Sequence, residues 1–317
     1  MRRFFPRRGP SWPQVVDRLP VTRRPELWFC PVHASEDLLP WLLGDGPGLL
    51  HDRNGILQLY GHTFRNQLEH IGPNTLERWA AEGVGGVIAT LPLVLEVGSL
   101  KECAYDADIP ITTPAAQNAI DGLRTLVPGV AVRLAMDEPL VAADRCPLTV
   151  DEAVHRVAEF ARAFDLETVG LVEGFPSIPV SRALEFVDRL AADGLRLPFV
   201  HLDVDYNVFT TQKQLETGYR DLRTFRDELR TRGIASGVIV WGRDDRTEAT
   251  FIQSARQLFA IFQRAFEADW PDHLIIQSWG QESPVGPGLP GKNLPSTRRL
   301  WQLVEELERT LQPRPDS

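Results

Sequence analysis

The chain has 317 residues, 43% of them hydrophobic, and a formal net charge of −9. This length suits one large α/β barrel or two ordinary domains. The negative charge argues against binding to nucleic acid or to an anionic membrane, and no apolar run reaches the roughly 18 residues that span a bilayer. The expected partner is therefore a small molecule or a glycan. The oligomeric state is left open.

The first 24 residues are expected to form a flexible arm. Arg2 and Arg3 are not followed by the apolar stretch of an export signal, and residues 9–13 are turn-like. The three cysteines are widely spaced and form no paired framework, which predicts a reducing compartment. A cytoplasmic protein is the resulting expectation.

Beyond the arm, short apolar runs alternate with amphipathic segments, a rhythm that predicts repeated βα units. Most of the runs are almost continuously apolar, as expected for strands that are buried on both faces. Eight strands are predicted, over residues 27–33, 56–62, 86–92, 130–138, 168–174, 199–206, 236–242 and 273–280.

Helices are predicted between these strands. The segment Thr149-Val150-Asp151-Glu152 has the pattern of a capping box and opens a helix that reaches about Phe164. Further helices are expected over residues 74–82, 179–194, 211–232, 247–268 and 296–311, and irregular stretches over 43–54, 93–109 and 280–295.

Eight βα units in a chain of this length predict a single closed (β/α)₈ TIM barrel over residues 25–312, with a short tail over 313–317. An open doubly wound sheet would also alternate strands and helices, but it usually carries a glycine-rich phosphate turn after its first strand. Residues 27–36 contain no such turn.

The fourth predicted strand ends on Asp137, Glu138 and Pro139. Proline has no N–H to give to a sheet, so the two carboxylates should lie where the strand opens into a loop. In a parallel α/β barrel the active site is built at the C-terminal ends of the strands, here called the mouth. Loop capping or salt bridging is the simpler alternative for the pair.

Other strand ends should deliver polar and aromatic side chains to the same mouth. Carboxylates and amides hydrogen-bond hydroxyl groups, and indole rings pack on the apolar faces of sugars, so this mixture indicates a polyhydroxylated ligand. The candidates for ligand contact are His62, Asp137, Glu173, Asp203, Tyr206, Trp241, Arg243, Gln277 and Trp279.

The pattern resembles the clan A glycoside hydrolases, which are (β/α)₈ barrels whose fourth strand ends in Asn-Glu-Pro or a close variant. The resemblance implies that Glu138 is the general acid/base, that Trp279 matches the strand-eight tryptophan, and that Tyr206 supports the nucleophile. The clan's strand-seven Glu has no counterpart in residues 238–245, so Asp205 or Asp244 is expected to act as nucleophile or base.

The leading hypothesis is thus a carbohydrate-active hydrolase that uses Glu138 with Asp205 or Asp244 and needs neither metal nor cofactor. One alternative is a divalent-metal-dependent sugar isomerase, epimerase or lyase, with carboxylates and a histidine from successive strands as ligands. The other is a non-catalytic barrel that binds a glycan or a partner.

Overall fold

A computed structural model gives the structure of the chain. It describes residues 24–31, 37–60, 79–98, 112–146, 148–164, 169–211, 215–242, 247–278 and 295–311. Predictions that concern other residues, such as those for the N-terminal arm and the C-terminal tail, lie outside these ranges.

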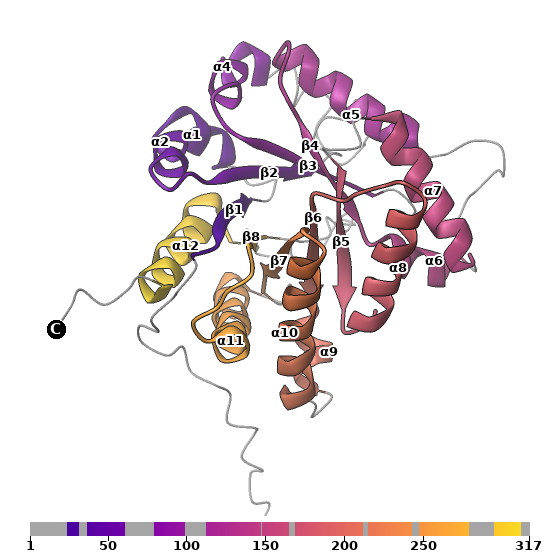
Figure 1. Cartoon of the computed structure of the whole chain (residues 1–317). Coiled ribbons are helices and arrows are strands. Elements are labelled where there is room, and N and C mark those ends of the chain that lie inside the picture. Colours follow the sequence, from indigo (N-terminus) through magenta and orange to yellow (C-terminus); the bar gives the residue numbers. More distant parts are fainter. Residues whose placement is uncertain are drawn as a thin grey trace, which may run out of the picture.

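Eight parallel strands pair in chain order and close into a barrel (Figure 1). The closure is made by the first and last strands, which pair with Glu26 opposite His273 and Cys30 opposite Gln277. The predicted fold class is therefore confirmed. The strands are β1 (Glu26–Cys30), β2 (Ile56–Tyr60), β3 (Leu93–Gly98), β4 (Arg133–Asp137), β5 (Val169–Phe175), β6 (Phe199–Val204), β7 (Ala235–Val240) and β8 (His273–Gln277).

Helices surround the barrel, as Figure 1 shows. They are α1 (Leu38–Leu43), α2 (Gly46–His51), α4 (Val84–Ile88), α5 (Thr112–Leu126), α6 (Pro139–Arg145), α7 (Val150–Ala163), α8 (Val180–Ala192), α9 (Tyr206–Thr211), α10 (Leu215–Thr231), α11 (Glu248–Phe266) and α12 (Thr297–Leu311). None of the helices within the described ranges is long and apolar enough to cross a membrane.

The start of α7 confirms the predicted capping box. The Glu152 N–H donates to the Thr149 hydroxyl at 3.2 Å, and the Thr149 N–H donates to the Glu152 carboxylate at 2.7 Å. Two of the N–H groups that a helix leaves without partners are satisfied in this way. The buried stripe that includes Val154 and Val157 then holds α7 against the core.

Side chains alternate between the two faces of each strand and so divide the core into two layers. The outer layer lies between the strands and the helices. The inner layer fills the barrel and consists of Trp28, Cys30, Ile56, Tyr60, Val94, Ala135, Val172, Phe199, Ile239 and Ile275. A residue two positions along a strand from an inner-layer residue shares its face, which decides what can reach the mouth.

The third predicted strand, over 86–92, is wrong. Helix α4 begins after Gly83, whose φ of 77° few other residues adopt, and runs to Ile88. The strand follows Pro92 and starts at Leu93, inside a stretch that was expected to be irregular. Both segments are short apolar runs, and periodicity alone does not separate a buried strand from a short buried helix.

A strand over 86–92 would have brought Thr90 to the mouth, and this shift moves it away. Thr90 precedes β3, and its hydroxyl donates to the Val87 carbonyl at 2.8 Å. The expectation that the cysteines form no pair is wrong as well, because Cys146 is disulfide-bonded while Cys30 is a free, buried thiol. The reducing compartment stays a prediction. The sequence offered no signal for this bond, since no recognisable spacing of cysteines marks it.

Candidate functional site at the barrel mouth

Glu138 follows the last residue of β4 and turns its chain sharply. Its φ and ψ are 47° and 50°, the left-handed conformation that is uncommon outside glycine. The Glu138 N–H donates to the Val172 carbonyl at 2.8 Å, and its own carbonyl accepts the Ala142 N–H at 2.9 Å. Glu138 is thus the residue that precedes α6, with Pro139 in the first helical position.

The carboxylate of Glu138 lies over the inner face of β5. A Cβ added to Gly174 would be 2.8 Å from Oε1 of Glu138 and 3.1 Å from Cγ2 of Val141. Gly174 shares the face of Val172, which belongs to the inner core. A glycine at this position therefore makes the space in which the Glu138 carboxylate rests, at the mouth and on the inner side of the barrel.

Two aspartates flank this position on the neighbouring strands. Asp137 is the last residue of β4 and lies opposite Val172, and Asp203 of β6 lies opposite Gly174. Asp137 shares the face of Ala135, and Asp203 shares the face of Phe199, both of which belong to the inner layer. Both aspartates are half-buried. We call Asp137, Glu138 and Asp203 the carboxylate cluster. All three were predicted from the sequence as mouth residues.

Asp205 lies just beyond β6, and its N–H and carboxylate form hydrogen bonds within the turn that follows the strand. Its N–H donates to the Phe175 carbonyl at 2.8 Å, and its Oδ1 accepts the Asn207 N–H at 2.8 Å. This turn leads into α9. The carboxylate of Asp205 therefore has a structural partner, whereas alternation places Asp203 toward the interior.

Glu173 lies on the opposite face from the one expected. Its Oε1 accepts the Leu140 N–H at 2.9 Å, and the Val141 N–H also donates to this carboxyl. Glu173 thus satisfies the first N–H groups of α6 from the outer side of β5. Burial raises the pKa of Glu173 well above its ordinary value, and the nearby charges of Glu138 and Asp137 raise it further.

Tyr206 also belongs to the outer layer. Its hydroxyl donates to the Gln257 side chain of α11, and its ring packs in the core between strands and helices. Trp241, directly after β7, is half-buried and contacts both layers of the core. Gln277 is 2% exposed and shares the inner face of Ile275. His62, Arg243, Asp244 and Trp279 lie outside the described residues.

The structure adds a second polar group to the mouth, of which the sequence predicted only Gln277. The Gln58 amide donates to Glu96 Oε2 at 2.6 Å, and the Tyr60 hydroxyl donates to the Ser278 carbonyl at 3.0 Å. Cys30 and Gln277 complete this group, which we call the amide cluster: Cys30, Gln58, Tyr60, Glu96 and Gln277. All five are buried and belong to β1, β2, β3 and β8.

The ionisable members of the amide cluster other than Glu96 are held neutral. Burial raises the pKa of the Tyr60 hydroxyl well above its usual value, and the Cys30 thiol and Glu96 raise it further. Burial and then Glu96 likewise raise the pKa of Cys30. A buried, protonated thiol is unreactive, so Cys30 acts as a small packing group.

Two carbonyl oxygens of the amide cluster have no hydrogen-bond donor within the described part of the chain. They are Oε1 of Gln58 and Oε1 of Gln277, both buried. Buried acceptors without donors cost free energy unless water or a ligand satisfies them. A signal for Gln58 was present in the sequence, because an amide interrupts an otherwise apolar strand. Glu96 could not be predicted at the mouth, because the third strand was predicted over 86–92 and Glu96 lies beyond it.

Within the described residues, no group of three or more His, Cys, Asp or Glu side chains is arranged to hold a metal ion. The site instead presents carboxylates on one side of the mouth and neutral amides with one carboxylate on the other. Such a set accepts hydrogen bonds from a ligand that is rich in hydroxyl or amino groups.

No protein-family model matches the chain, and no curated protein matches its sequence. Solved structures share its fold at low identity. A GH5_18 protein from Streptomyces cattleya, in complex with Manb1-4GlcNAc, is 9% identical, with 92% of this chain and 83% of that chain covered and a TM-score of 0.51.

Two further solved structures are similar to the chain with lower TM-scores. The active domain 2 of a chitinase from Pyrococcus furiosus is 14% identical over 93% of this chain and 98% of that chain, with a TM-score of 0.45. Methylaspartate ammonia lyase from Clostridium tetanomorphum is 13% identical over 93% of this chain and 59% of that chain, with a TM-score of 0.46. At these identities the likeness concerns the fold alone.

Proposed function

We propose that the chain is a carbohydrate-active barrel enzyme that hydrolyses glycosidic bonds. The observation that carries this proposal is the carboxylate of Glu138, which rests over Gly174 at the mouth, between Asp137 and Asp203 on the neighbouring strands. Glycoside hydrolases use a pair of carboxyl groups, one as general acid and the other as base or nucleophile.

In this proposal Glu138 is the general acid. It donates its proton to the glycosidic oxygen as the bond to the sugar breaks, so that the leaving group departs as a neutral alcohol. Glu173 positions Glu138 by binding the first N–H groups of α6.

The second carboxylate is assigned to Asp203, because Asp205 is engaged in the turn before α9 and Asp203 faces the interior. Asp203 either takes a proton from the attacking water or attacks the sugar carbon itself, and in both cases water supplies the hydroxyl of the product. Asp244, the other sequence-based candidate, lies outside the described residues.

The amide cluster would bind the sugar. Oε1 of Gln58 and Oε1 of Gln277 accept hydrogen bonds, which sugar hydroxyl groups supply. Trp241, half-buried beside the mouth, offers an indole ring as a stacking surface for a sugar.

The test compares Glu138→Gln with the unaltered chain on alkyl glycosides and on dinitrophenyl glycosides. Turnover of alkyl glycosides should fall about 10²- to 10⁴-fold, the usual contribution of a general acid. Cleavage of the dinitrophenyl glycosides should fall much less, because that leaving group departs without a proton. Glu82→Gln, at an exposed position, serves as the matched control.

Equal losses on both substrate types would remove the general acid role from Glu138. Glycan binding measured by calorimetry, together with no bond cleavage across a broad glycan panel, would instead support the non-catalytic binding barrel.

A further inference from the structure

The carboxylate cluster and the amide cluster lie side by side around the inside of the barrel. Glu96 of the amide cluster is opposite Ala135, and Asp137 follows two residues later on the same inner face of β4. Burial, then Glu96, and further Asp137 raise the pKa of Cys30. A charge in the carboxylate cluster therefore acts on the amide cluster, so the two clusters belong to one binding region.

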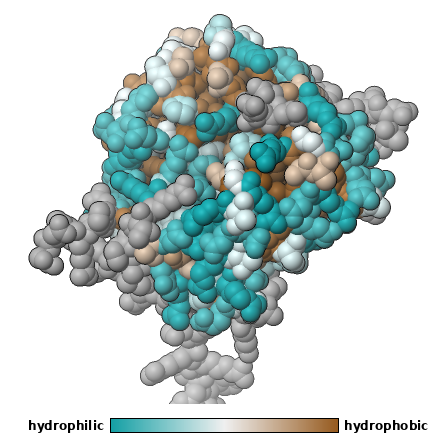
Figure 2. Space-filling model, in the orientation of Figure 1, coloured by the Kyte–Doolittle hydropathy of each residue, from teal (hydrophilic) through white to brown (hydrophobic). Residues whose placement is uncertain are grey.

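The helices around the barrel carry charges of both signs. Figure 2 shows hydrophilic side chains over much of the outer surface. Arginines of the helices and their connections pair there with acidic residues, for example Arg162 with Asp193 at 2.7 Å and Arg232 with Asp188 at 2.7 Å. The charges of the outer layer therefore compensate one another locally.

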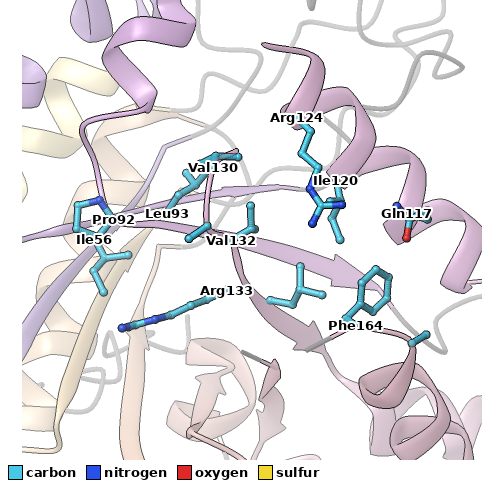
Figure 3. A pocket seen from close by; sticks show the side chains of 13 residues that line it. Ile56, Pro92, Leu93, Gln117, Ile120, Arg124, Val130, Val132, Arg133 and Phe164 are labelled. Atoms are coloured by element: carbon cyan, nitrogen blue, oxygen red, sulfur yellow. The ribbon is translucent and has the colours of Figure 1, made fainter. Parts of the chain in front are cut away.

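The described strands, in contrast, bring only acidic charge to the mouth. Four carboxyl groups face the interior near the strand ends: Glu96, Asp137, Glu138 and Asp203. These strands contain no lysine and one arginine, Arg133, which begins β4 and lines a cavity at the opposite end of the barrel (Figure 3). Their two histidines, His201 and His273, contact each other near that same end. A lining of one sign attracts a ligand of the other sign.

Each amide and hydroxyl group of the amide cluster already donates a hydrogen bond. The Gln58 amide donates to Glu96, the Gln277 amide to the Tyr60 oxygen, and the Tyr60 hydroxyl to the Ser278 carbonyl. Oε1 of Gln58 and Oε1 of Gln277 remain as acceptors that receive no donor from the described residues. The two side chains are 0% and 2% exposed, so a donor must enter the barrel to reach them.

These two acceptors lie close to a carboxylate. Cys30 is opposite Gln277 on one side, and the register of β1 with β2 puts Gln58 on the other. Gln58 in turn contacts Glu96. An ammonium group has three donors, no acceptor and a positive charge, which matches two amide oxygens and a carboxylate. A hydroxyl group or an acetamido group would bring a further acceptor to a place that already has too many.

We propose that the sugar bound at the mouth is an amino sugar with a free, protonated amine, whose ammonium group donates to Oε1 of Gln58, to Oε1 of Gln277 and to the carboxylate of Glu96. This inference rests on the proposed function, because it names the class of sugar on which Glu138 acts. The hydrogen bond to Glu96 joins two charged groups and is therefore stronger than a bond from a neutral hydroxyl.

Calorimetric titration of the full chain with free sugars tests the inference without requiring turnover. Glucosamine, galactosamine and mannosamine are each compared with the parent hexose and with the N-acetyl derivative. In at least one series the amino sugar should bind about tenfold more tightly than both analogues, as expected for a gained charge-assisted hydrogen bond. This preference should disappear from pH 6 to pH 9 as the amine loses its proton, and the parent hexose controls for titration of the mouth itself.

Two variants locate the amine. Glu96→Gln, which keeps an acceptor for the Gln58 amide, should raise the amino-sugar Kd about tenfold and the Kd of the parent hexose much less. Gln277→Met removes one of the two amide acceptors at similar side-chain size and should also weaken binding of the amino sugar. Glu82→Gln, at an exposed position, should change neither Kd.

The inference is overturned if none of the three amino sugars binds more tightly than its parent hexose, or if the preference persists at pH 9 or in Glu96→Gln. Preferential binding of an amino sugar supports it even when no glycoside is cleaved, a result that would count against hydrolysis alone. Cleavage of neutral glycosides by a chain that shows no preference for amines would overturn this inference and leave the proposed function intact.

Discussion

Two glycines on the inner face of β5 mark the two ends of the barrel. A Cβ on Gly170 would lie 2.3–2.4 Å from three atoms of the Phe199 ring, and a Cβ on Gly174 would lie 2.8 Å from the Glu138 carboxylate. The same residue type, four positions apart, makes room for an aromatic ring at one end and for a carboxylate at the other. One end is filled by packed rings, and the other holds the candidate site.

The packed end is filled by rings. The Trp28 ring stacks on His273 with 4.8 Å between centroids and meets His201 edge-on at 4.7 Å. Nε2 of His201 lies 2.9 Å from Nδ1 of His273. Burial, followed by the neighbouring His273, lowers the pKa of His201 well below its usual value, so this histidine is neutral and structural.

The largest effect on stability is expected from Gly170→Ala. The new methyl group would force the Phe199 ring out of its place among Trp28 and His201, and such overpacking costs about 1–3 kcal/mol. Urea unfolding should show this loss, while glycan affinity at the mouth should stay the same. A loss of affinity would show that the two ends are not independent.

Glu173→Gln should change how stability depends on pH. In the unfolded chain Glu173 loses its proton near its ordinary pKa of about 4.3, while the folded protein retains it because burial raises the pKa. The folded state thus binds more protons above that pH, and this residue lowers stability as pH rises, by at most about 1.4 kcal/mol per pH unit.

Urea unfolding from pH 5 to pH 8 measures this contribution. The Gln variant keeps an acceptor for the Leu140 N–H and should lose less stability with rising pH than the unaltered chain. Glu82→Gln, at an exposed position, controls for the removal of a carboxylate. Parallel curves for the two variants and the unaltered chain would contradict a raised pKa at Glu173.

The smallest effect on stability, below about 1 kcal/mol, is expected from Gly174→Ala. The nearest atom to the new methyl group is the end of a flexible side chain, which can move by a few tenths of an ångström. That shift displaces the Glu138 carboxylate, so turnover of alkyl glycosides should fall about tenfold, since catalysis is sensitive to position. Unchanged turnover would mean that Gly174 does not set the position of Glu138.

The sequence predicted seven of the eight strands and the site of Glu138 because both depend on local signals. Buried parallel strands are apolar runs, and Pro139 ends β4 at a definite residue. The faces of the strand ends could not be predicted in the same way. Glu173 and Asp203 both stand near the ends of apolar runs, yet one faces α6 and the other the interior, because the phase of alternation depends on barrel packing.

The amide cluster was harder to foresee for a different reason. Its members come from four strands that are distant in sequence, and Gln58 and Glu96 become partners only through the register of β2 with β3. No local pattern encodes that register. The capping box at Thr149, in contrast, is contained in four consecutive residues and was predicted correctly.

The pairing of Glu26 with His273 has a consequence during synthesis on the ribosome. Strand β1 emerges early, but its second neighbour is β8, so one edge of the growing sheet stays open until most of the chain has been translated. Open edges readily pair with other chains, and contacts between distant segments form slowly. Nascent chains of this protein should therefore depend on chaperones until β8 has left the exit tunnel.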